Sequence, residues 1–386
     1  MSNIIKYQWL KKMKEKMYFC TFCRIMLGIE IEKKRIFGLD FLRAFAILCV
    51  VHAHGLHLLN DSFSHLTRIP LPHGVDMFFV ISGFLIGTSF LKYSEHNGII
   101  DSSKTLRFYG RTALRILPNY YVIMVIYYFL VQGGIVNGNI HEFPLWRFAT
   151  FTQNFATPFY NFYWESWSLS VQIWFYIMFP LILMILSKHI KVKKATLFIS
   201  LFFITSSLVF RYIEAAHASD KFWWDVWMRK TVMSRFDNIY IGVIAAWIKF
   251  YYPEFWKKNS IKCLIIGIII MIVTFIIPRE MKTFYTNVIY LSIAPVAIAM
   301  WFPFATSVKE SKTFIGQIIS HFSILSYAMF LVNLMIVQII DNNFADYFKQ
   351  IGAEGYGIYW IVVIVASYIL YIVVEKQFVK IRDKVM

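Results

Sequence analysis

The feature that most constrains this chain is a series of apolar runs, each long enough to cross a lipid bilayer. Stretches such as 263–277 and 358–374 contain no charged residue. A membrane-spanning α-helix needs about 20 mainly apolar residues, whereas a transmembrane barrel shows short alternating segments. Of the 386 residues, 58% are hydrophobic and only 16% are charged, which excludes a soluble protein. The sequence therefore predicts an all-α, polytopic integral membrane protein.

The apolar runs divide into about ten predicted membrane-spanning helices. Their expected positions are 39–59, 73–92, 115–131, 164–187, 195–213, 232–250, 261–278, 283–305, 317–340 and 356–375. If the N-terminus is cytoplasmic, the cytoplasmic segments hold 28 Lys and Arg residues and the opposite face holds nine. Cytoplasmic loops of membrane proteins are enriched in these residues, so the count predicts that both termini are cytoplasmic.

The same charge bias explains the formal net charge of +17 without a nucleic-acid partner. The four cysteines support no disulfide framework, and Cys20 and Cys23 form a single CxxC without the second pair of a zinc site. The ten histidines do not cluster at ligand spacings, so we expect no metal.

Three segments are expected along the chain. Residues 1–36 form a basic cytoplasmic segment, either an amphipathic helix on the membrane surface or a disordered leader, with Met26 as an alternative start. Residues 37–376 form the membrane domain, and 377–386 form a cytoplasmic tail.

The first span carries Arg43 and His54 on one face. At 100° per residue, their separation of eleven residues brings them within about 20° of alignment, about 16 Å apart along the axis. His57 lies about 40° from that face, and His52 points the opposite way. Histidine at this depth suits a general base, although a structural histidine bonded to a neighbouring helix has the same pattern.

A stripe of arginines precedes the third apolar run. Arg107, Arg111 and Arg115 are spaced four residues apart, which places them on one helical face. Guanidinium groups bind phosphate oxygens in pairs, so the stripe could hold a nucleotide-like donor. A cytoplasmic anchor for the helix would look the same.

Polar residues also occur in three other spans. Asp76 lies near the outer end of the second span, whose Ser82 and Gly83 favour close helix packing. Ser326 and Asn333 are seven residues apart on one face of a late span.

The fourth span begins with another polar face. Glu165, Ser168 and Gln172 are spaced to share this face among tryptophans. An acid, a hydroxyl and an amide in an aromatic slot resemble a polyol-binding surface, but an aromatic belt with one capping acid is the alternative.

Taken together, these segments resemble the acyltransferase family 3 membrane proteins, which O-acylate cell-surface glycans and related acceptors. The matching stretches occur in the family's order and are GLDFLRAFAILCVVHAHG, GVDMFFVISGFLIG, RTALRILPNYY, WSLSVQIWFY, SRFDNIYIGVIAAW and LSYAMFLVN. They cover nearly all of residues 38–375. The family's arginine followed eleven residues later by histidine maps onto Arg43 and His54.

The resemblance implies an O-acyltransferase in the inner (plasma) membrane, with acyl-CoA, by default acetyl-CoA, as donor substrate and no bound cofactor. His54 would be the catalytic base, Arg43 would hold the donor or the developing oxyanion, and Arg111 and Arg115 would engage the CoA phosphates. The acceptor would be a sugar hydroxyl of a surface polysaccharide or glycolipid.

The remaining expectations concern the acceptor and the surroundings of the protein. The candidate acceptor contacts and supporting residues are Asp76, Glu165, Ser168, Gln172 and Asn333. Membrane lipids and separate polysaccharide-biosynthesis proteins are the expected partners, since the soluble hydrolase-like domain fused to some members is not seen here.

Three positions depart from the family pattern. Arg111 lies four residues before Arg115 where three is usual, because Thr112 takes that place; both spacings keep one face. Gln172 replaces a usual carboxylate and Asn333 replaces a usual histidine, so two titratable groups are lost. These losses keep two other hypotheses open: a glycan or lipid transporter on the same fold, and a scaffold of an envelope-polysaccharide complex.

Overall fold

The computed structural model describes residues 35–59, 70–142, 144–278, 280 and 282–385, and within these ranges it contains helices but no strand. The long helices are α2 (Phe37–Gly55), α4 (Gly74–Asn97), α5 (Ser102–Gln132), α7 (Ser166–Leu186), α8 (Val192–Ile213), α10 (Phe236–Tyr251), α12 (Ser260–Ile276), α13 (Tyr290–Ala305), α14 (Phe314–Asn343) and α16 (Ala353–Leu370). Shorter elements extend or connect them: η1 (Leu56–Leu58), α6 (Leu145–Ala149), η3 (Glu214–His217), α9 (Lys221–Trp224), η4 (Asp225–Arg229), α11 (Pro253–Lys258), η5 (Tyr285–Ile289), α15 (Ala345–Ile351), η6 (Tyr371–Glu375) and α17 (Lys376–Val385). The predicted all-α fold is confirmed. The predicted segment 1–36 lies, apart from its last two residues, outside the described residues.

Each of the ten predicted spans coincides with one of the long helices. Eight helical segments of the described chain are long and apolar enough to cross a membrane. The other two predicted spans correspond to α10 and α12, which have 16 and 17 residues. The chain is thus a multi-pass membrane protein, and the count of ten spans and the cytoplasmic position of both termini stay predictions.

Helix α5 begins well before the predicted third span. The side chain of Asp101 caps its first turn by accepting a hydrogen bond from the Lys104 backbone N–H at 2.7 Å. Hydropathy places the start later because the apolar pattern begins only near Arg115. As a result, Arg107, Arg111 and Arg115 all project from one continuous helix.

Glycines allow α4 and α10 to touch backbone to backbone. A Cβ atom on Gly83 would lie 1.9 Å from the carbonyl oxygen of Ile239, and one on Gly242 would lie 2.1 Å from that of Val80. Neither position has room for a side chain. The predicted packing role of the Ser-Gly pair in the second span is therefore confirmed for the glycine.

Two buried ion pairs join α10 to its neighbours. Arg235, the residue before α10, donates to Asp76 of α4. Arg211 of α8 lies 2.9 Å from Asp237 of α10, whose carboxylate also accepts from Ser292. The four charged side chains are at most 6% exposed. Charges buried in this way are tolerated because they are paired.

The two longest interhelical loops pack against each other. The side-chain amide of Asn154 donates to the backbone oxygens of Trp167 at 3.0 Å and Lys230 at 2.7 Å. These bonds tie the loop after α5 to the start of α7 and to the segment between α9 and α10. These contacts of Asn154 fix one wall of the site described below.

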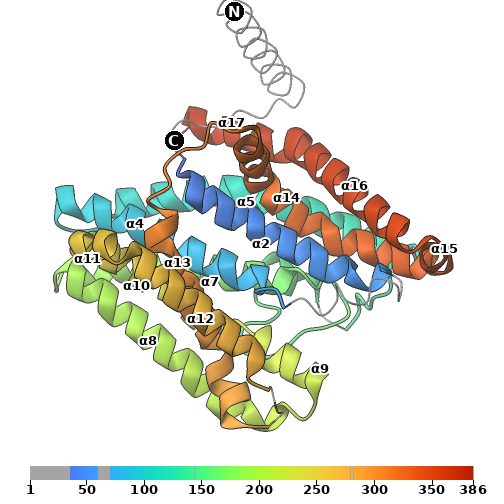
Figure 1. Cartoon of the computed structure of the whole chain (residues 1–386), viewed down its shortest axis with the longest axis horizontal. Coiled ribbons are helices and arrows are strands. Elements are labelled where there is room, and N and C mark those ends of the chain that lie inside the picture. Colours follow the sequence, from blue (N-terminus) through green and yellow to red (C-terminus); the bar gives the residue numbers. More distant parts are fainter. Residues whose placement is uncertain (1–34, 60–69, 143, 279, 281, 386) are drawn as a thin grey trace, which may run out of the picture.

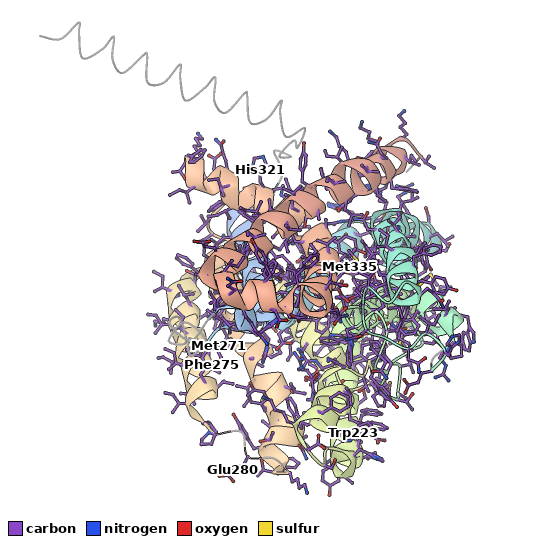
Figure 2. The ribbon with its side chains drawn as sticks, turned by 90° about the vertical axis from the view of Figure 1, so that its right-hand side faces the viewer. Trp223, Met271, Phe275, Glu280, His321 and Met335 are labelled. Atoms are coloured by element: carbon purple, nitrogen blue, oxygen red, sulfur yellow. The ribbon has the colours of Figure 1, made fainter. Side chains whose placement is uncertain are left out.

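The connecting elements gather at two ends of the helices. Figure 1 shows α11 at one end, with α9 and α15 toward the other. Figure 2 shows Trp223 and Glu280, from two separate connections, at the same end of the molecule and away from His321.

Candidate active site

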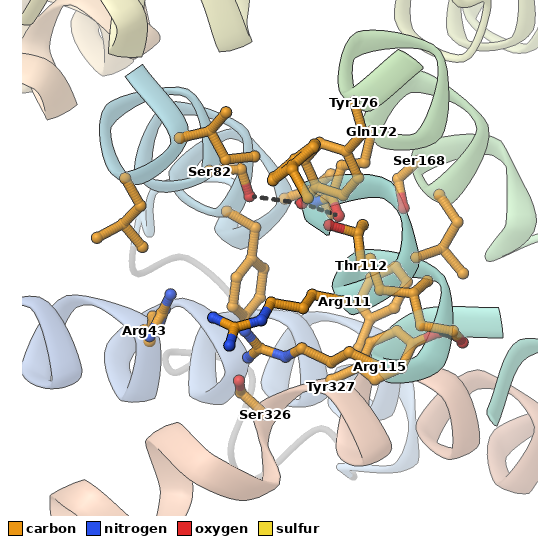
Figure 3. Close-up of a pocket in the computed structure, with 18 of the residues that line it drawn as sticks. Arg43, Ser82, Arg111, Thr112, Arg115, Ser168, Gln172, Tyr176, Ser326 and Tyr327 are labelled. Atoms are coloured by element: carbon orange, nitrogen blue, oxygen red, sulfur yellow. Dashed lines mark hydrogen bonds between the residues drawn. The ribbon is translucent and has the colours of Figure 1, made fainter. Parts of the chain in front are cut away.

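A cavity of about 300 Å³ lies between α2, α4, α5, α7 and α14 (Figure 3). We call it the arginine cavity because four arginines line it, namely Arg43, Arg111, Arg115 and Arg382. None of the described residues that line it carries a carboxylate. Figure 3 shows Arg111 and Arg115 extending from α5 toward the side where Arg43 lies. Such a cavity suits a ligand with several phosphate oxygens.

One wall of the arginine cavity is polar but uncharged. The Tyr176 hydroxyl lies 3.4 Å from both Ser82 Oγ and Gln172 Oε1, and Ser168 lines the cavity beside them. Gln172 therefore serves as a hydrogen-bond acceptor for a buried tyrosine, a task that needs no ionisable group.

A second cavity, of about 330 Å³, contains His54. We call it the histidine cavity. The other described residues that line it are Val75, Trp164, Glu165, Trp167, Arg229, Lys230, Phe330, Leu334 and Gln338. It thus combines an imidazole, a carboxyl group, two cations and two indole rings, which is a mixture suited to a polar, ring-shaped ligand.

His54 is held by Asn333. Its Nδ1 lies 2.5 Å from Asn333 Oδ1. The amide nitrogen of Asn333 donates to the carbonyl oxygens of Met329 at 2.8 Å and Phe330 at 2.7 Å, so the amide oxygen must face the imidazole. The oxygen can only accept, and Nδ1 therefore carries the proton. Nε2 is left with its lone pair, as a general base requires.

The neighbouring histidines are engaged elsewhere. His57 Nε2 contacts the Asp341 carboxylate at 2.9 Å, and His52 Nδ1 contacts the Tyr356 hydroxyl at 2.7 Å. Neither lines the histidine cavity. Of the three histidines in the first span, only His54 lines the arginine cavity or the histidine cavity, and Arg43, predicted to share its face, lines the other one.

The carboxyl group of Glu165 also lines the histidine cavity and forms no ion pair within the described part of the chain. Glu165 is 2% exposed, and its Oε1 lies 3.4 Å from the Tyr127 hydroxyl, which also donates to Gln338 Oε1 at 2.5 Å. Glu165 Oε2 has no hydrogen-bond partner among the described residues. A hydrogen bond from a ligand group to such a buried oxygen would stabilise the complex, because the oxygen otherwise lacks a partner.

Asp225, which lies outside the predicted spans, pairs with both cations of the histidine cavity. Asp225 contacts Arg229 and lies 2.7 Å from the Lys230 ammonium. Burial opposes ionisation of Asp225, but the two cations outweigh it and lower the pKa of Asp225 to about 2. Burial lowers the pKa of Lys230. The Lys230 ammonium also lies 4.3 Å from the centre of the Trp164 ring.

The predicted polar face of α7 is divided between the two cavities. Ser168 and Gln172 line the arginine cavity, whereas Glu165 lines the histidine cavity. Seven helical residues rise about 10 Å, so one face of α7 can pass from one cavity to the next. Asp76 lines neither cavity among the described residues, because it is paired with Arg235.

Several site residues were not found from the sequence. Arg382 was assigned to a cytoplasmic tail, but the tail forms α17 and brings this arginine to the arginine cavity. Arg229 and Lys230 were counted only as loop charges. Their proximity to tryptophans could have drawn attention to them, but the sequence holds no periodic signal that places this loop beside His54.

Comparison with known proteins identifies the family. A family model described as an acyltransferase domain matches residues 36–375. A provisionally named O-acetyltransferase of Staphylococcus aureus (strain COL) is 29% identical over 339 residues, which cover 80% of this chain and 52% of that protein. The O-acetyltransferase OatA of Staphylococcus aureus (strain NCTC 8325 / PS 47) is 25% identical over 343 residues, with the same two coverages.

The chain spans about half the length of the curated relatives it matches. No solved structure matches it. The family match covers nearly the whole of the membrane domain and contains every described lining residue of both cavities except Arg382. The chain belongs to the acyltransferase family 3.

Proposed function

We propose that the chain is a multi-pass O-acyltransferase of the inner (plasma) membrane. It moves an acyl group, by default acetyl, from acyl-CoA to a hydroxyl of a cell-surface polysaccharide or glycolipid. The observation that carries the proposal is the adjacency of two cavities, one lined by four arginines and the other by a histidine whose bond to Asn333 leaves the lone pair on Nε2.

The arginine cavity is the donor site in this proposal. Arg111 and Arg115 each offer a planar fork of N–H donors to the phosphates of CoA, and Arg382 adds a third from α17. Arg43 lies on the opposite side of the cavity, where it holds the donor or the negative charge that develops on the thioester oxygen.

His54 is the base. Its Nε2 takes the proton of the acceptor hydroxyl as that oxygen forms a bond to the thioester carbonyl carbon. The carbon–sulfur bond then breaks, its electron pair goes to the CoA sulfur, and the proton passes from His54 to that thiolate. Asn333 keeps Nδ1 protonated throughout and stabilises the imidazolium, which is an orienting role that requires no titratable group.

The histidine cavity is the acceptor site. Trp164 and Trp167 offer apolar ring faces to a sugar, and the unpartnered Oε2 of Glu165 can accept a hydrogen bond from a sugar hydroxyl. The contact between Asn333 and His54 favours an enzyme over a transporter, since a transporter has no use for a histidine held in one tautomer.

The test needs no knowledge of the acceptor. Binding of acetyl-CoA to the purified protein is measured in wild type and Arg115→Ala, and slow thioester hydrolysis, with water as acceptor, in wild type and His54→Ala. We expect saturable binding that weakens without Arg115, and hydrolysis that falls about 10²–10⁴-fold without His54.

Three results would count against this proposal. A folded His54→Ala protein that hydrolyses acetyl-CoA at the wild-type rate would remove the base. A folded wild-type protein that binds no acyl-CoA would favour the transporter. Substitutions of His54 and Arg115 that lower only thermal stability would favour the scaffold.

A further inference from the structure

The two cavities meet at only two of the described side chains. Val75 of α4 and Phe330 of α14 line both, and the other described lining residues belong to one cavity or the other. The four arginines thus lie on one side of this pair and His54 lies on the other. We call the pair the junction.

Both junction residues are held by their surroundings. Gly74, which precedes Val75, packs so closely on α2 that a Cβ atom would lie 2.1 Å from the carbonyl oxygen of Ala46. Phe330 is 7% exposed, and its carbonyl accepts the 2.7 Å hydrogen bond from Asn333. Its ring also meets the Phe78 ring nearly edge-on, with the centres 6.4 Å apart. Neither backbone can withdraw to widen the junction, so the two side chains decide its width.

We propose that Val75 and Phe330 set the length of the acyl group and restrict the donor to short acyl-CoA thioesters, with acetyl strongly preferred over butyryl. The inference rests on the proposed function. The sulfur comes from the arginine side and the attacking hydroxyl from the histidine side, so the thioester carbonyl must lie at the junction during transfer. The acyl chain beyond that carbonyl then meets the valine and phenylalanine side chains.

The selection is steric, because the acyl chain takes no part in the bond changes. The acceptor oxygen bonds to the carbonyl carbon, the carbon–sulfur bond breaks, and the chain moves unchanged from sulfur to oxygen. One methylene in a shaped apolar pocket changes kcat/KM by about 10- to 200-fold. We therefore expect wild type to lose at least about tenfold in kcat/KM for each added methylene.

The experiment compares acetyl-, propionyl- and butyryl-CoA as donors. Release of the CoA thiol, with water as acceptor, is followed in wild type, Phe330→Ala and Val75→Ala. We expect Phe330→Ala to reduce the acetyl-to-butyryl ratio of kcat/KM by at least about tenfold, because it removes the larger side chain. We expect Val75→Ala to reduce the same ratio by a smaller factor than Phe330→Ala does. This variant still tests the proposal if Phe330→Ala fails to fold.

Two matched controls come from the same helices. Leu85→Ala enlarges only the arginine cavity, from α4, and Leu334→Ala enlarges only the histidine cavity, from α14. Both remove an apolar side chain of one cavity and leave the junction intact. We expect both to keep the acetyl-to-butyryl ratio within about threefold of wild type, because a substitution that does not touch the junction acts nearly independently of it.

The outcomes separate this inference from the proposed function. Equal use of acetyl- and butyryl-CoA by wild type, or an unchanged ratio in both junction variants, overturns the length rule and leaves the acyltransferase proposal standing. A control that relaxes the ratio as much as Phe330→Ala also overturns the rule, because selection would then lie elsewhere. A folded wild type that turns over none of the three thioesters refutes the proposed function and the length rule with it.

Discussion

Asn333 offers a sharp test of how His54 is prepared for catalysis. Leucine has the same number of side-chain heavy atoms and the same branching as asparagine. It has no oxygen to accept the Nδ1–H of His54 and no amide to bond the carbonyls of Met329 and Phe330. The imidazole can then turn or exchange its proton between the two nitrogens. We predict that Asn333→Leu lowers kcat and leaves the KM for acyl-CoA nearly unchanged, because the arginine cavity is untouched.

The size of the effect follows from one lost hydrogen bond. A buried polar group that loses its partner costs about 1–3 kcal/mol. A change of 1.36 kcal/mol in the activation free energy is a factor of ten in rate. The fall in kcat is therefore about 5- to 150-fold, smaller than the fall expected for His54→Ala, which removes the base itself.

The assay is thioester hydrolysis by the purified protein at several pH values. Asn333→Asp keeps an oxygen that can accept from Nδ1 and should recover part of the lost kcat, which a general loss of packing would not allow. Asn343→Leu makes the same chemical change on α14, at an exposed amide that bonds the Ile135 carbonyl at 2.8 Å. Wild-type kcat in Asn333→Leu, or an equal loss in Asn343→Leu, would refute the argument.

Three further predictions use the same protein preparations. Arg115→Ala should raise the KM for acyl-CoA by about 10- to 150-fold, since a charge-assisted bond contributes about 1.5–3 kcal/mol. Arg107→Ala, on the same helix but outside the arginine cavity, should leave this KM unchanged, and equal effects of the two substitutions would contradict the donor site. The ionised carboxylate of Asp225 stabilises the folded state above the ordinary pKa of 3.8 by up to about 2 kcal/mol, and this effect is lost as the pH falls toward 2. The melting temperature of wild type should therefore drop more steeply over that pH range than the melting temperature of Asp225→Asn. Parallel curves would count against the pairing of Asp225 with Arg229 and Lys230. Gly83→Ala should lower the melting temperature, because the added methyl group forces α4 away from α10 at a cost of about 1–3 kcal/mol. Gly357→Ala should be tolerated, since nothing lies within 4 Å of the added carbon. Equal melting temperatures of the two variants would exclude the close contact between α4 and α10.

The sequence predicts the helices well, because membrane-spanning segments must satisfy their own backbone hydrogen bonds and therefore leave a long apolar signal. Helical periodicity also places Arg111 and Arg115 on one face, and both reach the same cavity. The wheel argument for Arg43 and His54 gives less, because Arg43 lines the arginine cavity and His54 lines the histidine cavity, although both project from α2.

Relations between helices are not encoded in such periodicity. The ion pair of Asp76 with Arg235 joins residues 159 positions apart, and no pattern in either segment names its partner. Arg382 reaches the arginine cavity only because α17 folds back, and Lys230 reaches the other only because Asn154 holds its backbone. The sequence thus indicates which residues bear the chemistry, and the packing of distant segments decides which of them meet.

The two ion pairs of α10 have a consequence for how the protein is made. With 16 residues and charges at its start, α10 enters a lipid bilayer poorly by itself, because an unpaired charge in hydrocarbon costs several kcal/mol. Its partners Asp76 and Arg211 belong to α4 and α8, which the ribosome completes earlier. We expect α10 to wait at the translocon until these helices are in place and to leave it already neutralised. Loss of Asp76 would then show first as a fault in biogenesis, with less protein in the membrane rather than slower turnover.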